Sequence, residues 1–346
     1  MCVPLLISHT ELLFVCENIK FISPGGVAGR HGPGRETMEK TEKAVQSWVN
    51  YKKHTFVPPV SVFDTKQGYW QKRKKEWKEA GLHGQAGRDN GLIGKGMQDL
   101  AKMKSANLTG TSVFDPVLCE IVYNWYSMKG GTIFDPFAGG PTRGVVAELL
   151  GRCYIGIDLS ERQVDANQIN ADRLGVCPAW YCDDSRNADK YMDDGTADLV
   201  FSCPPYHNLE KYSTHPLDLS NMNFKDFAAA YQEIISISCR KLKQDRFAVF
   251  VVGDIRDSKG AYRDFIGLTK QAFFSCGLCL YNEAVLLEPY GTAQLRAGQL
   301  FRATRKTAKV HQNVLVFYKG EIRKIKQNYE NTFSWANISA LPCGGA

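Results

Sequence analysis

The feature that most constrains the fold is the stretch of residues 132–158, TIFDPFAGGPTRGVVAELLGRCYIGID, which has the pattern strand, glycine turn, helix, strand. Residues 132–134 and 153–157 are short apolar runs, typical of buried strands. Pro141 suits the first turn of a helix, where a missing N–H has no intrahelical partner to lose, and residues 144–150 continue that helix. A strand–helix–strand unit of this kind predicts an α/β fold.

The glycine turn and the end of the second strand are suited to holding a nucleoside. Glycines let the backbone approach a ligand closely, and the helix that follows presents unpaired N–H groups. Asp158, at the end of the second strand, is placed to bind two ribose hydroxyls. No GK[ST] follows the turn, which excludes a Walker-type phosphate loop. Taken alone, the turn fits an ordinary tight turn of any α/β protein equally well.

Residues 198–206, DLVFSCPPY, form a second motif, in which an apolar strand is followed by Pro204, Pro205 and Tyr206. Two consecutive prolines end the hydrogen-bond ladder of a strand and stiffen the chain. They leave carbonyl groups that lack N–H partners beside an aromatic ring. These groups can accept the N–H bonds of an amine and offer a stacking surface to a flat ring.

Found together and in this order, DPFAG and PPY resemble the amino-methyltransferases of DNA, which transfer a methyl group from S-adenosylmethionine to N4 of cytosine or N6 of adenine. The resemblance covers roughly residues 58–320, and its FDxxQGYWQxRK element is similar to one in phage- and plasmid-borne members. It implies a Rossmann-like, seven-stranded, mostly parallel sheet of the class I methyltransferase type, with an N-terminal extension. It also implies S-adenosylmethionine as cofactor, DNA as partner, and a cytoplasmic location in a bacterial or phage-infected cell, in a restriction-modification or phage setting.

The same resemblance assigns cofactor-binding roles to four segments. The segment before Pro116 covers the methionine end of the cofactor, the glycine bend and Asp158 hold its middle, and an acid after strand 178–182 accepts the adenine amine. For that acid, Asp184 matches the family better than Asp183, although an Asx turn would also explain it. The expected cofactor-binding residues are Thr111, Ser112, Phe114, Asp115, Asp135, Pro136, Phe137, Ala138, Gly139, Gly140, Asp158, Asp184 and Ser185.

The expected catalytic residues are Cys203, Pro204, Pro205 and Tyr206. The carbonyls of Cys203 and Pro204 would accept the N–H bonds of the exocyclic amine, and Tyr206 would stack on a base that has left the duplex. The family usually places Asp, Asn or Ser before Pro-Pro-Tyr, so Cys203 leaves the choice between cytosine and adenine open. A Cys203 nucleophile that attacks cytosine C5 is the less favoured interpretation, because C5 enzymes carry their cysteine after the prolines.

Two segments are basic enough to contact nucleic acid. Residues 289–311 are interpreted as a long loop whose cations bind phosphates, namely Arg296, Arg302, Arg305, Lys306 and Lys309. Together with residues 206–222 they would form the recognition region. Residues 58–77 interleave aromatic and basic side chains, and they fit either an amphipathic helix with a solvated charged face or an element beside nucleic acid or cofactor.

The 346 residues divide into an N-terminal extension (1–57), a basic segment with a connector (58–107), a methyltransferase domain (108–320) and a tail (321–346). Translation is expected to start at Met38, which the N-terminal mass of the native protein would test. A net charge of +7 is compatible with nucleic acid. The eleven cysteines stand singly, which favours reduced thiols, and neither a zinc site at Cys276 and Cys279 nor a membrane span is expected. An RNA base methyltransferase and a DNA-binding relative without turnover remain as alternatives.

Overall fold

A computed structural model of the chain describes residue 57 and residues 59–82, 113–207, 215–289 and 293–329. These residues contain one eight-stranded sheet with the order β1-β7-β8-β6-β5-β2-β3-β4. β8 runs antiparallel to β6 and β7, and every other pairing is parallel. The strands are β1 (Val62–Asp64), β2 (Thr132–Asp135), β3 (Cys153–Asp158), β4 (Ala179–Cys182), β5 (Ala197–Ser202), β6 (Leu242–Val252), β7 (Cys279–Leu287) and β8 (His311–Lys319).

The predicted α/β class with a mostly parallel, Rossmann-like sheet is therefore confirmed, and β1 adds an eighth strand to the seven expected. The extra strand comes from residues 58–77, for which the sequence analysis expected no strand, and it pairs Val62 with Val285 at the edge of the sheet. The N-terminal extension and the connector up to residue 107 lie almost wholly outside the described residues.

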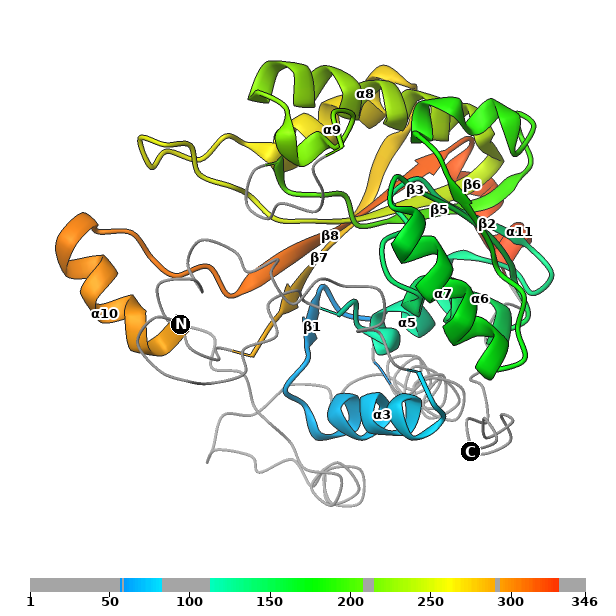
Figure 1. Cartoon of the computed structure of the whole chain (residues 1–346), viewed down its shortest axis with the longest axis horizontal. Coiled ribbons are helices and arrows are strands. Elements are labelled where there is room, and N and C mark those ends of the chain that lie inside the picture. Colours follow the sequence, from blue (N-terminus) through cyan, green and yellow to red (C-terminus); the bar gives the residue numbers. More distant parts are fainter. Residues whose placement is uncertain (1–56, 58, 83–112, 208–214, 290–292, 330–346) are drawn as a thin grey trace, which may run out of the picture. The chain divides into compact units, whose positions relative to one another are not determined.

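Helices cover both faces of the sheet (Figure 1). Their bounds are α3 (Gly68–Glu79), α5 (Pro116–Tyr126), α6 (Thr142–Leu149), α7 (Glu161–Arg173), α8 (Phe224–Lys241), α9 (Phe265–Ser275), α10 (Ala293–Thr304) and α11 (Ile325–Tyr329), with short 3-10 turns η1 (Ser185–Lys190), η3 (Leu219–Asn221) and η4 (Ile322–Lys324). Ile133 packs with α5 and α6 on one face, whereas the next residue, Phe134, packs with α8 and α9 on the other. This alternation follows from the two-residue period of a strand.

Local sequence signals explain where several helices begin. The side chain of Asp115 accepts a hydrogen bond from the backbone N of Val117 at 2.9 Å, and Pro116 occupies the first turn of α5. Ser160 caps α7, because its hydroxyl accepts from the backbone N of Gln163. Side chains of these types satisfy N–H groups that have no partner within the helix.

α3 packs against α5 through its aromatic and basic side chains. Trp70 and Trp77 are fully buried. Trp77 donates to Glu120 at 2.9 Å, Arg73 forms an ion pair with the same carboxylate, and Lys74 lies 2.7 Å from Asp115. Other lysines of α3 are exposed. The helix therefore has the amphipathic form with a solvated charged face, and its inner cations are used to attach it to α5.

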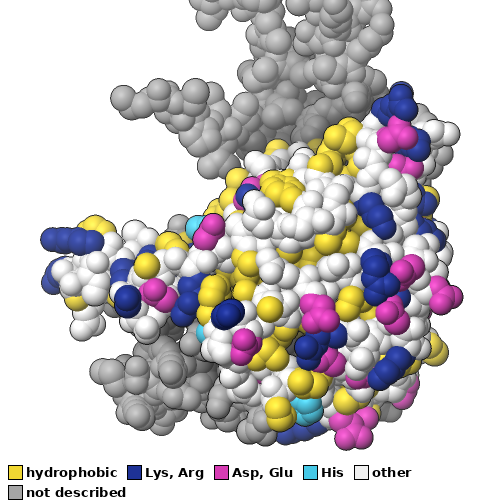
Figure 2. Space-filling model, turned by 90° about the horizontal axis from the view of Figure 1, so that it is seen from above, with side chains coloured by type: hydrophobic (Ala, Val, Ile, Leu, Met, Phe, Trp, Pro, Cys, Tyr) yellow, Lys and Arg dark blue, Asp and Glu magenta, His cyan; other side chains and the backbone are white. Residues whose placement is uncertain are grey.

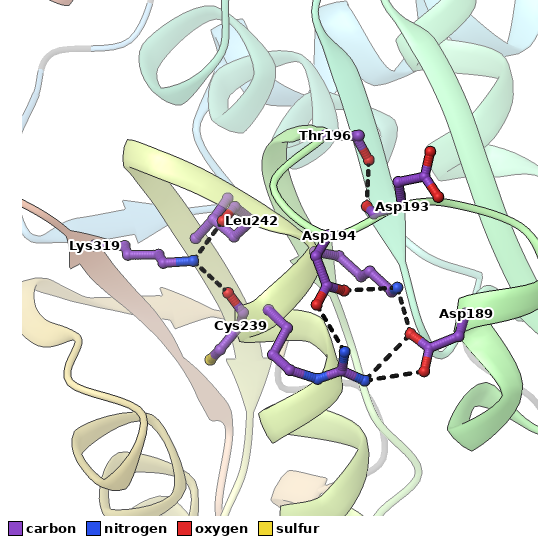
Figure 3. Close-up of polar contacts among 9 residues, drawn as sticks. Asp189, Asp193, Asp194, Thr196, Cys239, Leu242 and Lys319 are labelled. Atoms are coloured by element: carbon purple, nitrogen blue, oxygen red, sulfur yellow. Dashed lines mark hydrogen bonds and ion pairs between the residues drawn. The ribbon is translucent and has the colours of Figure 1, made fainter.

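The edge of the sheet where β5 and β6 begin is held by ion pairs (Figure 3). Lys241 is almost fully buried and lies 2.8 Å from Asp194, and it also pairs with Asp189. Arg240 contacts the same two carboxylates. Lys319 donates to two backbone carbonyls at the junction of α8 and β6, at 2.7 and 2.6 Å. These charges neutralise one another in a structural role, and they lie at the edge opposite the one where parallel strands bind ligands.

Candidate functional site

The glycine bend lies at the carboxyl end of β2 and is tied to β3. The backbone N of Ala138 donates to Ile157 at 3.0 Å, and that of Gly139 donates to the Asp158 carboxylate at 2.9 Å. Gly139 has φ 53°, a conformation that costs glycine little. On the other side of the bend, Asn167 of α7 donates to the Gly139 carbonyl at 2.7 Å. The bend is thereby fixed against the second strand of the unit before any ligand arrives.

Asp158 is half-buried at the end of β3. Its two oxygens accept from the backbone N of Ser160 at 2.8 Å and of Gly139 at 2.9 Å. Burial raises the pKa of Asp158, and these two hydrogen bonds oppose that rise. An ionised carboxylate has about four acceptor positions, so Asp158 retains capacity for the hydroxyls of a ligand.

Asp135 is completely buried and accepts hydrogen bonds from four donors. One oxygen accepts from the backbone N of Phe137 and, at 2.5 Å, from the hydroxyl of Ser202. The other accepts from the Arg143 guanidinium at 2.5 Å and from the hydroxyl of Tyr154 at 2.7 Å. The Asp135 carboxylate, which is expected to touch the cofactor, holds together four segments of the protein around it.

Arg143 is a site residue that the sequence analysis did not identify. It donates from one nitrogen to Asp135 and from another to the carbonyls of Phe137 and Ala138, at 2.6 and 2.9 Å. Burial lowers its pKa, but the adjacent Asp135 more than offsets this, so the pKa of Arg143 is raised. The guanidinium also lies 4.5 Å from the centre of the Phe114 ring. An arginine inside the apolar helix that follows the bend was the available signal, because a buried cation requires a partner.

The segment ahead of α5 and the bend contribute mainly structural contacts. Asp115 is engaged by Val117, Trp70 and Lys74. The Phe137 ring packs toward Phe250, with 6.4 Å between ring centres. Thr111 and Ser112 lie outside the described residues.

A pocket of about 560 Å³ opens beside the end of β4. Leu159, Asp183, Asp184 and Leu217 are among the residues that line it. Asp184 is bonded to the guanidinium of Arg186, at 2.6 Å at the shortest.

Asp183 lies next to Asp184 and accepts from Lys190 and Tyr191 at 2.9 and 2.8 Å. Burial alone would raise the pKa of Asp183, but its hydrogen bonds hold it well below the usual value. The hydroxyl of Ser185 donates to the Pro136 carbonyl, which joins this loop to the glycine bend.

The PPY motif lies directly beside the glycine bend, because β5 and β2 are paired neighbours. The Ser202–Asp135 hydrogen bond fixes the end of one strand to the end of the other. Burial raises the pKa of the Cys203 thiol to about 11, although the nearby Arg143 charge acts in the opposite direction. Cys203 is therefore a thiol near neutral pH, which disfavours its interpretation as a nucleophile.

Tyr206 is half-buried and held by its hydroxyl. The hydroxyl donates to the side-chain oxygen of Gln312 at 2.9 Å, and its ring meets that of Phe265 edge-on, with 6.0 Å between the centres. An ideal Cβ built on Gly253 would lie 3.7 Å from both the ring of Tyr206 and the amine of Lys309. Burial lowers the pKa of Lys309, and nearby Asp254 and Glu288 oppose the shift. Lys309, expected to bind phosphate, thus lies beside the PPY tyrosine.

The interpretation of residues 289–311 as a loop is wrong over residues 293–304, which form α10. Alanine, glutamine, leucine and arginine dominate this segment and favour helix. Arg302 and Arg305 are exposed, and Lys306 lies against the loop that contains Gly260. Arg296 belongs to α10, but its side chain lies outside the described part. Lys and Arg side chains gather at the end of the molecule that carries α10 (Figures 1 and 2).

The described part of the chain holds no disulfide among its eight cysteines and no group of three His, Cys, Asp or Glu side chains that could bind a metal ion. None of its helices has the length and apolar character that crossing a membrane requires.

Comparisons with known proteins give one family match. Solved structures similar to this chain include TrmN from Thermus thermophilus (16% identity, 60% of this chain and 49% of that chain, TM-score 0.42) and a methyltransferase from Pyrococcus furiosus (14%, 61% and 85%, 0.40). A TehB-like SAM-dependent methyltransferase from Corynebacterium glutamicum is also similar (15%, 64% and 97%, 0.38). The chain spans about half the length of TrmN, and no curated protein matches it. A family model described as DNA methylase (N6_N4_Mtase) matches residues 37–169. These matched residues include the glycine bend and Asp158.

Proposed function

We propose that this protein transfers a methyl group from S-adenosylmethionine to the exocyclic amine of a base in DNA, N4 of cytosine or N6 of adenine. The observation that carries the proposal is the 2.5 Å hydrogen bond between Asp135 and Ser202. It places the start of the glycine bend and the start of the PPY motif side by side at the carboxyl edge of the sheet. The cofactor and the base could therefore bind side by side at this edge.

The residues at this edge fit an S-adenosyl nucleoside. Asp158 keeps acceptor positions for two ribose hydroxyls, and the pocket of about 560 Å³ beside it has the size of ordinary ligand sites. We assign the adenine amine to Asp184, because Arg186 holds its carboxylate in place next to the bend. When bound, S-adenosylmethionine supplies an electrophilic methyl group on its sulfonium.

The PPY segment would hold the amine. The lone pair of an exocyclic nitrogen is delocalised into the ring, so the enzyme must orient it toward the methyl group. The carbonyls of Cys203 and Pro204 would accept the two N–H bonds and stabilise the charge that develops on the nitrogen. Pro205 stiffens the segment, and Tyr206 offers its ring to the base. The backbone carbonyls, rather than the Cys203 thiol, would therefore orient the amine and stabilise its charge.

Contact with DNA would come from α10. Arg302 and Arg305 are exposed on this helix and its C-terminal end, where they can reach phosphates. Arg296 and Lys306 complete the proposed set. Lys309 belongs with the base instead, since its amine is half-buried beside Tyr206.

The test is incubation with methyl-labelled S-adenosylmethionine and DNA, followed by digestion to nucleosides. The expected label is on N4-methylcytosine or N6-methyladenine. Label on RNA alone, label on C5 of cytosine, or retained DNA binding without any label would each refute the proposal.

Paired variants test the assignments within the site. Asp158→Asn is expected to weaken cofactor binding by about 10-fold or more, since a hydrogen bond to a charged group contributes roughly 1.5–3 kcal/mol. Asp189→Asn, at the opposite edge, is the matched control and should leave the affinity unchanged. Asp184→Asn and Asp183→Asn, compared directly, separate the two candidates for the adenine amine.

A further inference from the structure

A chain of hydrogen bonds runs from Tyr206 to a carboxylate. The Tyr206 hydroxyl donates to Oε1 of Gln312 at 2.9 Å, and Nε2 of Gln312 donates to Oε1 of Glu288. Gln312 is the second residue of β8, and Glu288 follows the last residue of β7. A backbone bond from Glu288 to Val310, at 3.0 Å, holds these two strand ends together. All three side chains therefore stand at the ligand edge of the sheet.

The Glu288 carboxylate determines the donor and acceptor roles in this series of hydrogen bonds. A carboxylate only accepts, so the Gln312 amide must turn its NH₂ toward Glu288 and its oxygen toward Tyr206. The tyrosine hydroxyl is consequently a donor with a fixed direction. The Tyr206 ring is also bounded by the fully buried ring of Phe265. The hydroxyl also lies 3.5 Å from the Val251 carbonyl, so polar and aromatic contacts together limit the orientations available to this ring.

We propose that Glu288 and Gln312 are positioning residues that orient Tyr206 for the incoming base. This inference rests on the proposed function, which places the base against that ring. A ring fixed before binding loses no rotational freedom when the base stacks on it, so less of the stacking energy is lost to ordering. The base would meet the PPY carbonyls in one orientation, which favours alignment of its amine with the methyl group.

Nothing in the local sequence indicates these two residues. Gln312 lies 106 positions from Tyr206, and Glu288 lies 24 positions from Gln312, so only the sheet brings them together. Glu288 also acts electrostatically on Cys203 and Lys309, which shows that it belongs to the same small group of side chains.

A double-mutant cycle on Tyr206→Phe and Gln312→Leu tests whether Gln312 acts through the tyrosine hydroxyl. Gln312→Leu should lower kcat by roughly 2- to 10-fold, the range that one neutral hydrogen bond supplies. The affinity of the Gln312→Leu variant for S-adenosylmethionine should not change. In the Tyr206→Phe background the same substitution should have almost no effect, because the bond it removes is already absent. An equal loss in both backgrounds would overturn the inference, since Gln312 would then act on the base directly.

Matched variants separate positioning from general stability. Asn313→Leu is the control, because the Asn313 amide donates to Glu283 at 3.0 Å across the same two strands, one residue along and thus on the other face. It should leave kcat unchanged. Glu288→Gln keeps an acceptor for Gln312 and should retain most activity, whereas Glu288→Leu should resemble Gln312→Leu. Equal losses in the two Glu288 variants would contradict the proposed role.

The same cycle measured by urea unfolding needs no substrate. Non-additive stabilities of the Tyr206 and Gln312 variants would support the hydrogen bond, and strict additivity would refute it. If the wild-type protein labels no DNA while the stabilities remain coupled, the proposed function fails although the hydrogen-bond chain stands. If DNA is labelled and the stabilities are additive, the positioning inference alone fails.

Discussion

Asp135→Asn is expected to be among the most destabilising conservative changes in this protein. The wild-type carboxylate is completely buried and faces four donors, two on each oxygen. Asparagine has one acceptor oxygen, and its NH₂ group must face the other pair of donors. In either orientation two donors lose their acceptor, and the buried charge of Arg143 loses its counter-ion.

The magnitude follows from the loss of that charge pair. Breaking a buried ion pair by neutralising one partner costs about 3–5 kcal/mol, because the remaining charge stays in a poorly solvated site. A domain has about 5–15 kcal/mol of stability in total, so the expected loss is a large part of it. Arg143→Lys should cost less, since the positive charge remains while the bonds to the Phe137 and Ala138 carbonyls are lost.

Urea unfolding of the wild-type protein and the two variants measures these differences. Asp189→Asn is the matched control, because its carboxylate is mostly exposed and Asp194 remains as an ion-pair partner for both Arg240 and Lys241. The reasoning would be refuted if Asp135→Asn destabilised the protein by no more than this control does. Such a result would mean that the carboxylate is protonated or solvated in the native protein and does not hold the bend.

Three further outcomes are expected. Cys203→Ser should change kcat by less than about threefold, and iodoacetamide at neutral pH should not inactivate the enzyme, because the pKa of the Cys203 thiol is about 11. A several-hundredfold loss of kcat would contradict the proposal that only the backbone of Cys203 takes part. Replacing Arg302 and Arg305 by glutamine should make the plot of log binding constant for DNA against log salt concentration less steep by roughly 1.8, while Arg323→Gln should not alter its slope. Equal slopes for the wild-type protein and both variants would exclude phosphate contact by α10. Burial alone would raise the pKa of Asp198, but hydrogen bonds from two β6 cations and a backbone N–H hold it below its ordinary value. Asp198 therefore stabilises the fold above about pH 4, and this stabilisation is lost as the pH falls further. The Tm of Asp198→Asn should consequently fall less steeply than that of the wild-type protein below about pH 5. Parallel declines of the two Tm values would disprove this role of Asp198.

The parts of the fold that could be predicted are those with a local signal. The apolar runs 132–134 and 153–157 predicted β2 and β3, and Pro141 with residues 144–150 predicted α6. β1 was missed because three residues carry no usable period, and the strand exists through its pairing with β7. α10 was missed because glycine and a run of cations were given more weight than its helix-forming residues.

The candidate site, like the fold, could be predicted only where a local sequence pattern marks it. The glycine bend and PPY each carry a local pattern, so their positions at the carboxyl edge followed from chain order. Arg143 and Tyr154 were missed because their roles depend on a carboxylate several residues away in the chain. Gln312 could not be predicted from the sequence, because β8 is antiparallel to its neighbours and only its register in the sheet brings the Gln312 side chain beside Tyr206.

The Asp135 carboxylate explains why the two motifs have to be considered together. Its donors are the bend at Phe137, the next helix at Arg143, the neighbouring strand at Tyr154 and the strand that leads into PPY at Ser202. A displacement of any one of these segments must either break a bond to this buried charge or move the other three. The glycine bend and the start of the PPY segment are therefore positioned by one group, and their separation is set by the protein's own contacts.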